Sequence, residues 1–311
     1  MSKQRKKAYL ALLTTSLIWG LASPVIKYSL NFTTPHTFLF YRFLIVSLIL
    51  FVPLILKLKK IKPSFTDFLK YLSLGFLGTP LTLLLLFSGL KKTTAVNASI
   101  ISLFTPLLII LGGVVFLGEK VTKNEKRGIF LILSGAFLGI IEPIFRSGLN
   151  FNQDILGNLL VFANTFSWAS FSLLRRKHGE KLDSLVLTAL SFTVGFVFLA
   201  IISFFSGSLP AISDPHALPG ILYMAILGSV IAYFTYIYGF SKIEASEATL
   251  FTYLEPVFAI PISVIFLKEK TGLFFGSGVV LIILGIFLAQ FHSRKTRKSV
   301  PAIELKPANK V

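Results

Sequence analysis

Thr105–Lys120 reads TPLLIILGGVVFLGEK, and 150 positions later Glu255–Lys270 reads EPVFAIPISVIFLKEK. Both stretches have proline as the second residue and end in Leu-x-Glu-Lys after an apolar run. The match extends over Gly89–Ala136 and Gly239–Ile286 at the same offset. Its identities include glycine and charged residues, which shared hydrophobicity alone does not produce. We therefore infer that the chain contains an internal duplication.

The duplication reaches the beginning of the chain. At an offset of 149, three residues of the first apolar segment correspond to three of the sixth: Thr15, Trp19 and Ser23 to Asn164, Trp168 and Ser172. Each copy then contains five segments. Because five is odd, the second copy enters the membrane from the opposite side, so the copies are inverted repeats related by a pseudo-two-fold axis in the membrane plane. Many secondary transporters are built in this way, with the solute site near the midplane.

The composition is that of a membrane protein. Apolar residues form 54% of the 311 positions and charged residues 14%, whereas soluble domains carry about 25% charge. A spanning helix needs roughly 20 apolar residues, so ten of them nearly fill the chain. The sequence predicts an all-α integral membrane fold with ten transmembrane helices in two inverted five-helix repeats, near residues 8–29, 36–56, 67–89, 93–117, 127–145, 155–175, 184–206, 217–240, 246–267 and 272–291.

The net charge of +18 comes from lysines and arginines clustered between the apolar runs. This placement indicates membrane topology, not a nucleic-acid partner. With the N-terminus inside, 23 basic residues fall on the cytoplasmic side and 5 on the other. We therefore expect both termini to be cytoplasmic, with the protein in the inner or plasma membrane.

The same pattern divides the chain into parts. Residues 1–7 form a cytoplasmic tail, 8–145 the first repeat, 146–154 an external linker, 155–291 the second repeat and 292–311 a basic cytoplasmic tail. The sequence has no cysteine, and its four histidines fall in loops, at a segment edge or in the tail. We therefore expect neither an intramembrane metal site nor a cofactor.

Several short motifs occur in the same order along this duplicated frame. The sequence resembles the EamA-like branch of the drug/metabolite transporter superfamily in Trp19-Gly20 followed by Lys27, in Arg42-Phe43, in Pro106 with Leu117-Gly118-Glu119, and in Leu254-Glu255-Pro256-Val257-Phe258-Ala259. The resemblance covers essentially the whole chain. It implies a ten-helix transporter of metabolites, often amino acids or related solutes, commonly exporting them. One departure is Lys268, which stands where the family has a glycine.

Glu255 is the most informative candidate for solute binding, because it lies well inside an apolar segment. A charge there costs roughly 2.5–3.5 kcal/mol on insertion scales, so it should face the bundle interior. Pro256, and Pro106 in the first copy, are expected to kink their helices. Glu255 is then placed to exchange a proton or neutralise a solute's ammonium group. The alternative is a protonated, hydrogen-bonded packing residue.

Polar and aromatic side chains at helical spacing extend this candidate site. Residues spaced by three or four share a helix face, which groups Thr252 with Glu255, Ser102 with Thr105, Trp19 with Ser23, and Asn164 with Trp168. Tyr233 and Tyr253 add rings that are candidates to border the pocket. For the hydroxyl residues the alternative is bonding to their own helix backbone, and for the aromatic residues it is ordinary packing.

Three charged residues near the outer ends of their segments are candidates for a gate. Arg42 lies about two turns inside its segment, at a depth similar to that of Glu142, and Lys27 is closer to the surface. An ion pair of Glu142 with Arg42 or Lys27 would close the outer side. The alternative is a static pair or independent snorkelling of the long side chains.

The sequence therefore predicts a secondary transporter for a small organic solute. It contains no phosphate-binding loop, Gly-x-Ser-x-Gly turn or His-Glu-x-x-His motif, so transport would be driven by a solute or ion gradient. The alternative from another class is a non-transporting membrane scaffold, receptor or membrane enzyme on the same bundle. Oligomeric state is not indicated by any feature of the sequence.

Overall fold

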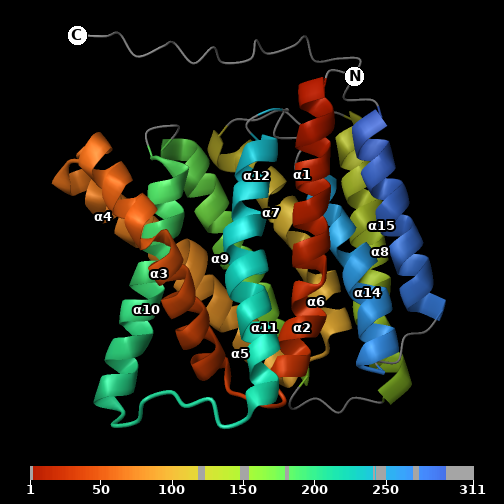
Figure 1. Ribbon diagram of the computed structural model, residues 1–311. Coiled ribbons are helices and arrows are strands. Elements are labelled where there is room, and N and C mark those ends of the chain that lie inside the picture. Colours follow the sequence, from red (N-terminus) through yellow and green to blue (C-terminus); the bar gives the residue numbers. More distant parts are fainter. Residues whose placement is uncertain are drawn as a thin grey trace.

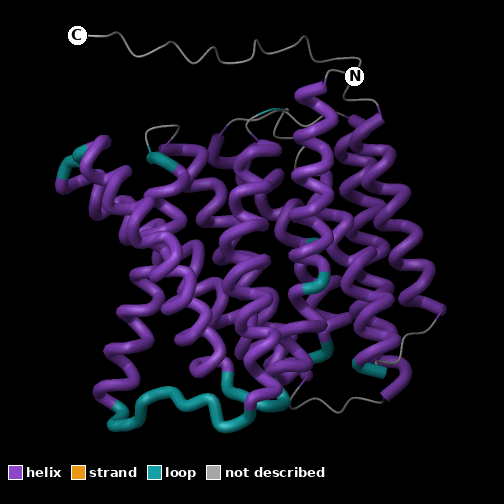
Figure 2. Tube along the Cα trace, in the orientation of Figure 1, coloured by secondary structure: helices purple, strands orange, loops and turns teal. Residues whose placement is uncertain are grey.

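The protein is all-helical in a computed structural model (Figures 1 and 2). The structure describes residues 3–117, 123–147, 154–178, 182–240, 242, 250–268 and 273–291, and within these ranges it contains no β-strand. The predicted all-α fold is thus confirmed at this level.

The helical elements of the first half follow in chain order. They are α1 (Lys3–Gly20), α2 (Ala22–Ser29), α3 (Pro35–Ile61), α4 (Phe65–Phe76), the π-helical segment η1 (Leu77–Leu81), α5 (Thr82–Lys92), α6 (Ala95–Ser102), α7 (Phe104–Leu117) and α8 (Lys123–Ser147).

The second half follows the same plan. Its elements are α9 (Asp154–His178), α10 (Ser184–Phe205), the 3-10 turn η3 (Pro215–Ala217), α11 (Leu218–Leu222), the π-helical segment η4 (Tyr223–Ile231), α12 (Ala232–Phe240), the 3-10 turn η5 (Leu250–Leu254), α14 (Glu255–Phe266) and α15 (Leu273–Phe291).

Six stretches in the described residues are long and apolar enough to span a membrane: 4–29, 35–61, 65–92, 95–116, 184–205 and 215–236. Each agrees within a few residues with a predicted segment. Large apolar side chains on their outer faces are exposed, among them Leu48, Phe51, Val52, Phe116 and Phe204. An exposed apolar surface of this kind is suited to lipid, so the protein is an integral membrane protein.

Hydroxyl and carboxylate side chains cap helices that begin at the bundle ends. Thr34 accepts a hydrogen bond from the Thr37 amide at the start of α3, and Thr94 accepts one from the Asn97 amide at the start of α6. Asp183 accepts bonds from two amides at the start of α10. These caps satisfy amides that have no partner inside the helix, which fixes where the chain re-enters the bundle.

The spans that contain Pro106 and Pro256 are interrupted just before these prolines. In the first, α6 ends at Ser102 and α7 begins at Phe104. In the second, a 3-10 turn ends at Leu254 and α14 begins at Glu255, so Pro256 lies in the first turn of a helix. A proline there removes no helical hydrogen bond. The regular helical hydrogen bonding is thus interrupted before Pro256, whereas the sequence suggested a kink made by the proline itself. The side chain of Pro106 is outside the described residues.

Lys268, the departure noted in the sequence, has φ of 54°. This left-handed conformation is one that glycine adopts without the steric cost of a Cβ atom. The chain therefore makes at Lys268 the turn for which a glycine would be expected, in spite of the lysine side chain.

Close helix contacts recur between equivalent residues of the two halves. A Cβ atom on Gly135 would meet the Gly278 carbonyl and come within 2.8 Å of Ile282, and one on Gly285 would lie 2.6 Å from the Gly128 carbonyl and 2.9 Å from Ile132. Each pair is the other shifted by 150 positions. Helices α8 and α15 therefore meet through reciprocal contacts, and they run side by side at one edge of the bundle (Figure 1).

A second reciprocal pair links the inner helices. Gly89 on α5 packs against Val161 on α9, and Gly239 on α12 packs against Leu12 on α1. Gly239 is the counterpart of Gly89 at an offset of 150, and Val161 is the counterpart of Leu12 at an offset of 149. The duplicated glycines thus have the same use in both halves, which is close approach of a helix from the other half.

Replacing Gly135 by alanine should destabilise the protein by about 1–3 kcal/mol, because the added methyl group has no space between α8 and α15. Gly276→Ala is the matched control on α15, since a Cβ atom there meets nothing within 4 Å. Thermal unfolding of the purified variants in detergent measures the difference. Equal melting temperatures for Gly135→Ala and Gly276→Ala would contradict the close contact.

Candidate functional site

Trp19 joins α1 to the second half of the bundle. Its indole N–H donates a hydrogen bond of 2.9 Å to the carbonyl of Gly228 in the π-helical segment η4. A π-helical turn alters the regular i-to-i+4 bonding, and Gly228 has no side chain to shield its carbonyl. The Trp19 ring also contacts Tyr233 and Tyr236 of α12, with ring centroids 5.4 and 5.2 Å away.

Glu255 lies beside this aromatic group as the first residue of α14. Gly20, the residue after Trp19, allows the contact, since a Cβ atom on it would lie 2.7 Å from the Glu255 carbonyl. The half-buried Glu255 carboxyl interacts electrostatically with the Tyr236 phenol. It has no hydrogen bond or ion pair with any other described residue. We call Trp19, Tyr233, Tyr236 and Glu255 the aromatic–carboxyl cluster.

The position of Glu255 at a helix start has an electrostatic consequence. The amides of the first turn point toward it and carry partial positive charge, which favours a carboxylate there. The sequence predicted a carboxyl group well inside a span, beside a proline kink. The structure places it at a break in the span, where a helix begins and its end offsets part of the cost of a charge in the membrane.

Arg42 lies deep in the bundle on α3, with 3% of its surface exposed. Its Nε–H donates a 3.0 Å hydrogen bond to Ser229 of η4, and its guanidinium carbon lies 5.9 Å from the Phe87 ring centroid and 6.0 Å from that of Phe192. Its Nη1 is buried and has no acceptor among the described residues.

These contacts are too weak to offset the free-energy cost of burying the positive charge of Arg42. Burial of an ion costs several kcal/mol, whereas cation–π contacts near the 6 Å limit contribute about 0.5–1 kcal/mol each. No carboxylate among the described residues forms an ion pair with Arg42. Its charge is therefore under-compensated by the described part of the protein.

Lys27 has a different environment. Its ammonium group donates hydrogen bonds to the carbonyls of Leu90 and Thr93, at 2.8 and 2.6 Å. These carbonyls end α5, where a helix carries partial negative charge. The Glu142 side chain is outside the described residues, so the pairing of Glu142 with Lys27 or Arg42 stays a prediction.

The remaining candidates are distributed over α2, α6, α7, α9 and η5. Asn164 is buried on α9, and Trp168 is half-buried and packs on Phe171 with ring centroids 5.2 Å apart. Ser102 donates to the carbonyl of Ala98 in its own helix, which is the self-bonding that the sequence left open. Ser23 and Thr105 are half-buried, and neither makes such a bond within the part of the chain that the structure describes. Thr252 is half-buried in η5, and the Tyr253 side chain is outside the described residues.

Sequence reasoning missed the residues that surround Arg42. Ser229 and Thr79 follow the duplicated glycines, Gly228 and Gly78, and both are buried in the π-helical segments. The Tyr233 phenol lies close enough to interact with both Thr79 and Arg42. In the sequence, both copies have a hydroxyl residue directly after the duplicated glycine, and this pattern could have identified Thr79 and Ser229.

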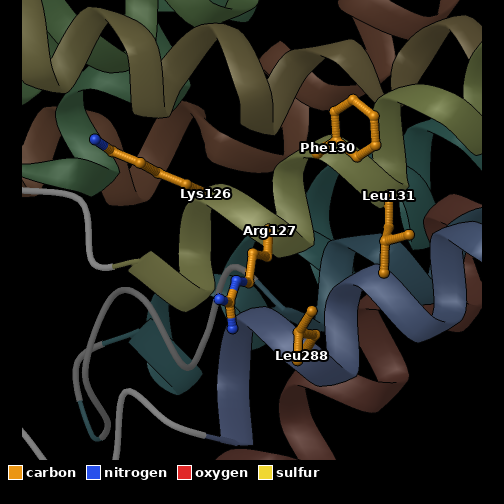
Figure 3. A pocket seen from close by; sticks show the side chains of 5 residues that line it. All are labelled: Lys126, Arg127, Phe130, Leu131 and Leu288. Carbon is orange, nitrogen blue, oxygen red and sulfur yellow. The ribbon is translucent and has the colours of Figure 1, made fainter.

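Two cavities differ in their surroundings. The larger, about 420 Å³, is a groove between α8 and α15 lined by Lys126, Arg127, Phe130, Leu131 and Leu288 (Figure 3). It is apolar apart from two cations at its end and lies at the edge of the bundle, where lipid is the natural neighbour. The smaller, about 80 Å³, is lined by Leu50, Ser184, Leu185, Thr188, Ser229, Tyr233 and Phe234. It adjoins the aromatic–carboxyl cluster through Tyr233.

Comparison with known proteins gives a consistent result. The model of the EamA-like transporter family matches the chain twice, at residues 6–141 and 155–291. An uncharacterized transporter from Archaeoglobus fulgidus is 32% identical over 285 residues, covering 91% of this chain and 96% of that protein. The uncharacterized transporter YyaM from Bacillus subtilis is 29% identical, covering 90% and 92%. One solved crystal structure shares the fold, with a TM-score of 0.70 at 17% identity over 94% of this chain and 99% of its own.

The Trp19 hydrogen bond can be tested against the other tryptophan. Trp19→Phe keeps a ring beside Tyr233 but removes the bond to Gly228, so we expect a loss of about 1 kcal/mol in stability. Trp168→Phe is the control, because the Trp168 indole N–H has no acceptor among the described residues. Thermal unfolding of both variants measures the difference in stability. An equal loss of stability in the two would show that the Trp19 hydrogen bond contributes nothing.

Proposed function

The chain belongs to the EamA-like transporter family, and from this premise we propose that it is a secondary transporter that moves a small organic solute across the membrane by alternating access. The observation that carries the proposal is the aromatic–carboxyl cluster. Trp19 comes from the first half of the chain, and Tyr233, Tyr236 and Glu255 come from the second. A solute held there lies between two bodies that move relative to one another.

We further propose that the chain forms ten spans in two inverted repeats, residues 8–145 and 155–291, joined by an external linker. Three observations support this. The family model matches each half separately, the glycine contacts of α8 with α15 are reciprocal, and π-helical segments lie at corresponding places before α5 and α12. Reciprocal contacts are those of an interface with a two-fold axis.

The chemistry of the cluster favours a solute with an ammonium group. The faces of tryptophan and tyrosine rings attract cations, and Glu255 supplies the opposite charge. An amino acid or a related metabolite fits this description. Export across the inner or plasma membrane is the direction that the resemblance to the family implies. The position of Glu255 also allows it to exchange a proton as the site alternates between the two sides.

Glu255→Gln should insert and fold normally and lose transport. The amide keeps the shape but not the charge, and losing a close charge partner costs about 2 kcal/mol, roughly thirtyfold in affinity. Uptake of a radiolabelled L-amino-acid mixture into proteoliposomes measures this between about pH 5 and pH 8.

The control is Asp214→Asn, which removes a carboxylate from the loop before α11. This variant should transport as the wild type does. If Glu255→Gln transports normally across the pH range, Glu255 is a packing residue. If the wild-type protein moves no labelled amino acid, the assignment of the solute class is wrong.

The topology is tested separately. With the N-terminus cytoplasmic and an even number of spans, a fluorescent protein fused after Lys298 should fluoresce and alkaline phosphatase at the same place should be inactive. In Figure 1 the start of α1 and the end of α15 lie at the same end of the bundle, as this requires. Phosphatase activity at that position would refute an even number of spans with an inside N-terminus.

A further inference from the structure

Arg42 carries a positive charge into the bundle, and no described acidic side chain forms an ion pair with it. Only its Nε–H has a hydrogen-bond partner, Ser229, and its Nη1 is buried without an acceptor among the described residues. A buried polar group without a partner is rare in native proteins and needs an explanation. A buried arginine is found where planar recognition of a carboxylate or phosphate matters.

The residues around Arg42 hold the guanidinium in place. Phe87 and Phe192 lie near it with ring centroids at about 6 Å, and Ser229 fixes the Nε edge. Ser229 is itself held, because its hydroxyl donates to the Met224 carbonyl at 2.8 Å within the π-helical segment. Arg42 is therefore positioned, and the Nη1 edge is the part of the guanidinium left to bind another group.

Arg42 lies one side chain away from the aromatic–carboxyl cluster. The Tyr233 phenol interacts electrostatically with Arg42, and the Tyr233 ring contacts Trp19. Ser229 and Tyr233, which both interact with Arg42, also line the small cavity of about 80 Å³. A water molecule takes about 30 Å³ in the liquid, so this cavity is of a size for a carboxylate group, not for a whole metabolite.

The lining of that cavity is mostly apolar and includes no acidic residue. Four of its residues carry hydroxyl groups: Ser184, Thr188, Ser229 and Tyr233. Ser184 in turn accepts a hydrogen bond from Arg175 at 2.5 Å. Two arginines thus contact this lining, Arg42 at Ser229 and Arg175 at Ser184, and their positive charges favour a negative charge nearby.

We propose that Arg42 binds the carboxylate group of the transported solute through its Nη1 edge. This deepens the proposed function and rests on it. With Glu255 and the rings taking the ammonium group, the substrate class becomes zwitterionic: amino acids and other metabolites that carry both an amine and a carboxylate. A simple amine satisfies only the aromatic–carboxyl cluster, and a simple carboxylate satisfies only Arg42.

The experiment uses small probes that need no knowledge of the solute. Thermal unfolding of the full-length protein in detergent is measured in sodium acetate and in sodium chloride at equal ionic strength. A carboxylate that binds the folded state raises the melting temperature by about 2–4 °C when present at about ten times its dissociation constant. The wild type should show this rise, and Arg42→Gln should not.

The matched control is Lys70→Gln, which removes one positive charge from the exposed Lys70–Asp67 pair. It should keep the acetate effect. Because Arg42 has no counter-charge among the described residues, Arg42→Gln should unfold in chloride at the wild-type temperature or above it. If that variant does not fold, Arg42→Lys replaces it; a lysine keeps the charge without the planar pair of donors, so the acetate shift should fall to less than half.

Three results would overturn the proposal. They are no acetate effect in the wild type, an equal effect in Arg42→Gln, and loss of the effect in Glu142→Gln with Arg42 intact, which would make Glu142 the partner of Arg42 in a gate. Transport is read separately in proteoliposomes. An Arg42-dependent acetate effect without amino-acid uptake leaves the anion site standing and refutes the carrier, whereas normal uptake by Arg42→Gln refutes the role of Arg42.

Discussion

Inside a bilayer no water is present to accept or donate a hydrogen bond, and the structure follows from this constraint. The described chain is helical, so backbone groups bond within their own segment. Where helices end, side chains take over, as Thr34, Thr94 and Asp183 do at helix starts. Serine hydroxyls donate to carbonyls four residues earlier, as Ser99 and Ser263 do. Among the described residues few buried side-chain nitrogen and oxygen atoms lack a partner, which makes those few informative.

Three departures from this rule are linked through Trp19 and Tyr233. The π-helical segment around Gly228 gives up regular bonding and receives Trp19, the span that contains Glu255 restarts as a helix at that residue, and Nη1 of Arg42 lacks an acceptor among the described residues. Regular helix would have been the most stable choice at each place. Departures from it at membrane depth are tolerated where the chain lines a cavity or is buried in protein, and in transporters broken helices surround the solute.

The duplicated frame and the chemistry placed on it are not equally symmetric. The glycine contacts are repeated faithfully, and both halves have a tryptophan on the corresponding helix. Yet Tyr233 and Tyr236 correspond to Leu83 and Leu86, and Glu255 corresponds to Thr105. Under the alternating access proposed above, a symmetric frame would give inward-open and outward-open states of similar energy, since exchanging the halves exchanges the states. An asymmetric site would let the solute stay bound to one half while the other moves.

Sequence alone located the spans but not the partners of their polar residues. Apolar runs determine depth in the membrane, so six segments agree with the structure within a few residues. Facing direction depends on which helices pack together, and that is set by contacts such as Gly20 against Glu255. For this reason the sequence predicted a proline kink beside Glu255 but not the neighbours of its side chain, and Ser229 was missed because its importance comes from Arg42 on a distant helix.

Lys27 and Arg42 show how packing separates two cations that the sequence grouped together as gate residues. Lysine has a compact ammonium group, and that of Lys27 lies on the last carbonyls of α5, where partial negative charge is already present. Arginine has a planar fork that needs paired acceptors, and a helix end does not provide them to Arg42. One cation is thus satisfied by the fold and holds α2 against α5. The other is positioned through its Nε–H, and its Nη1 has no acceptor among the described residues, which is the condition expected of a residue whose partner is brought by the solute.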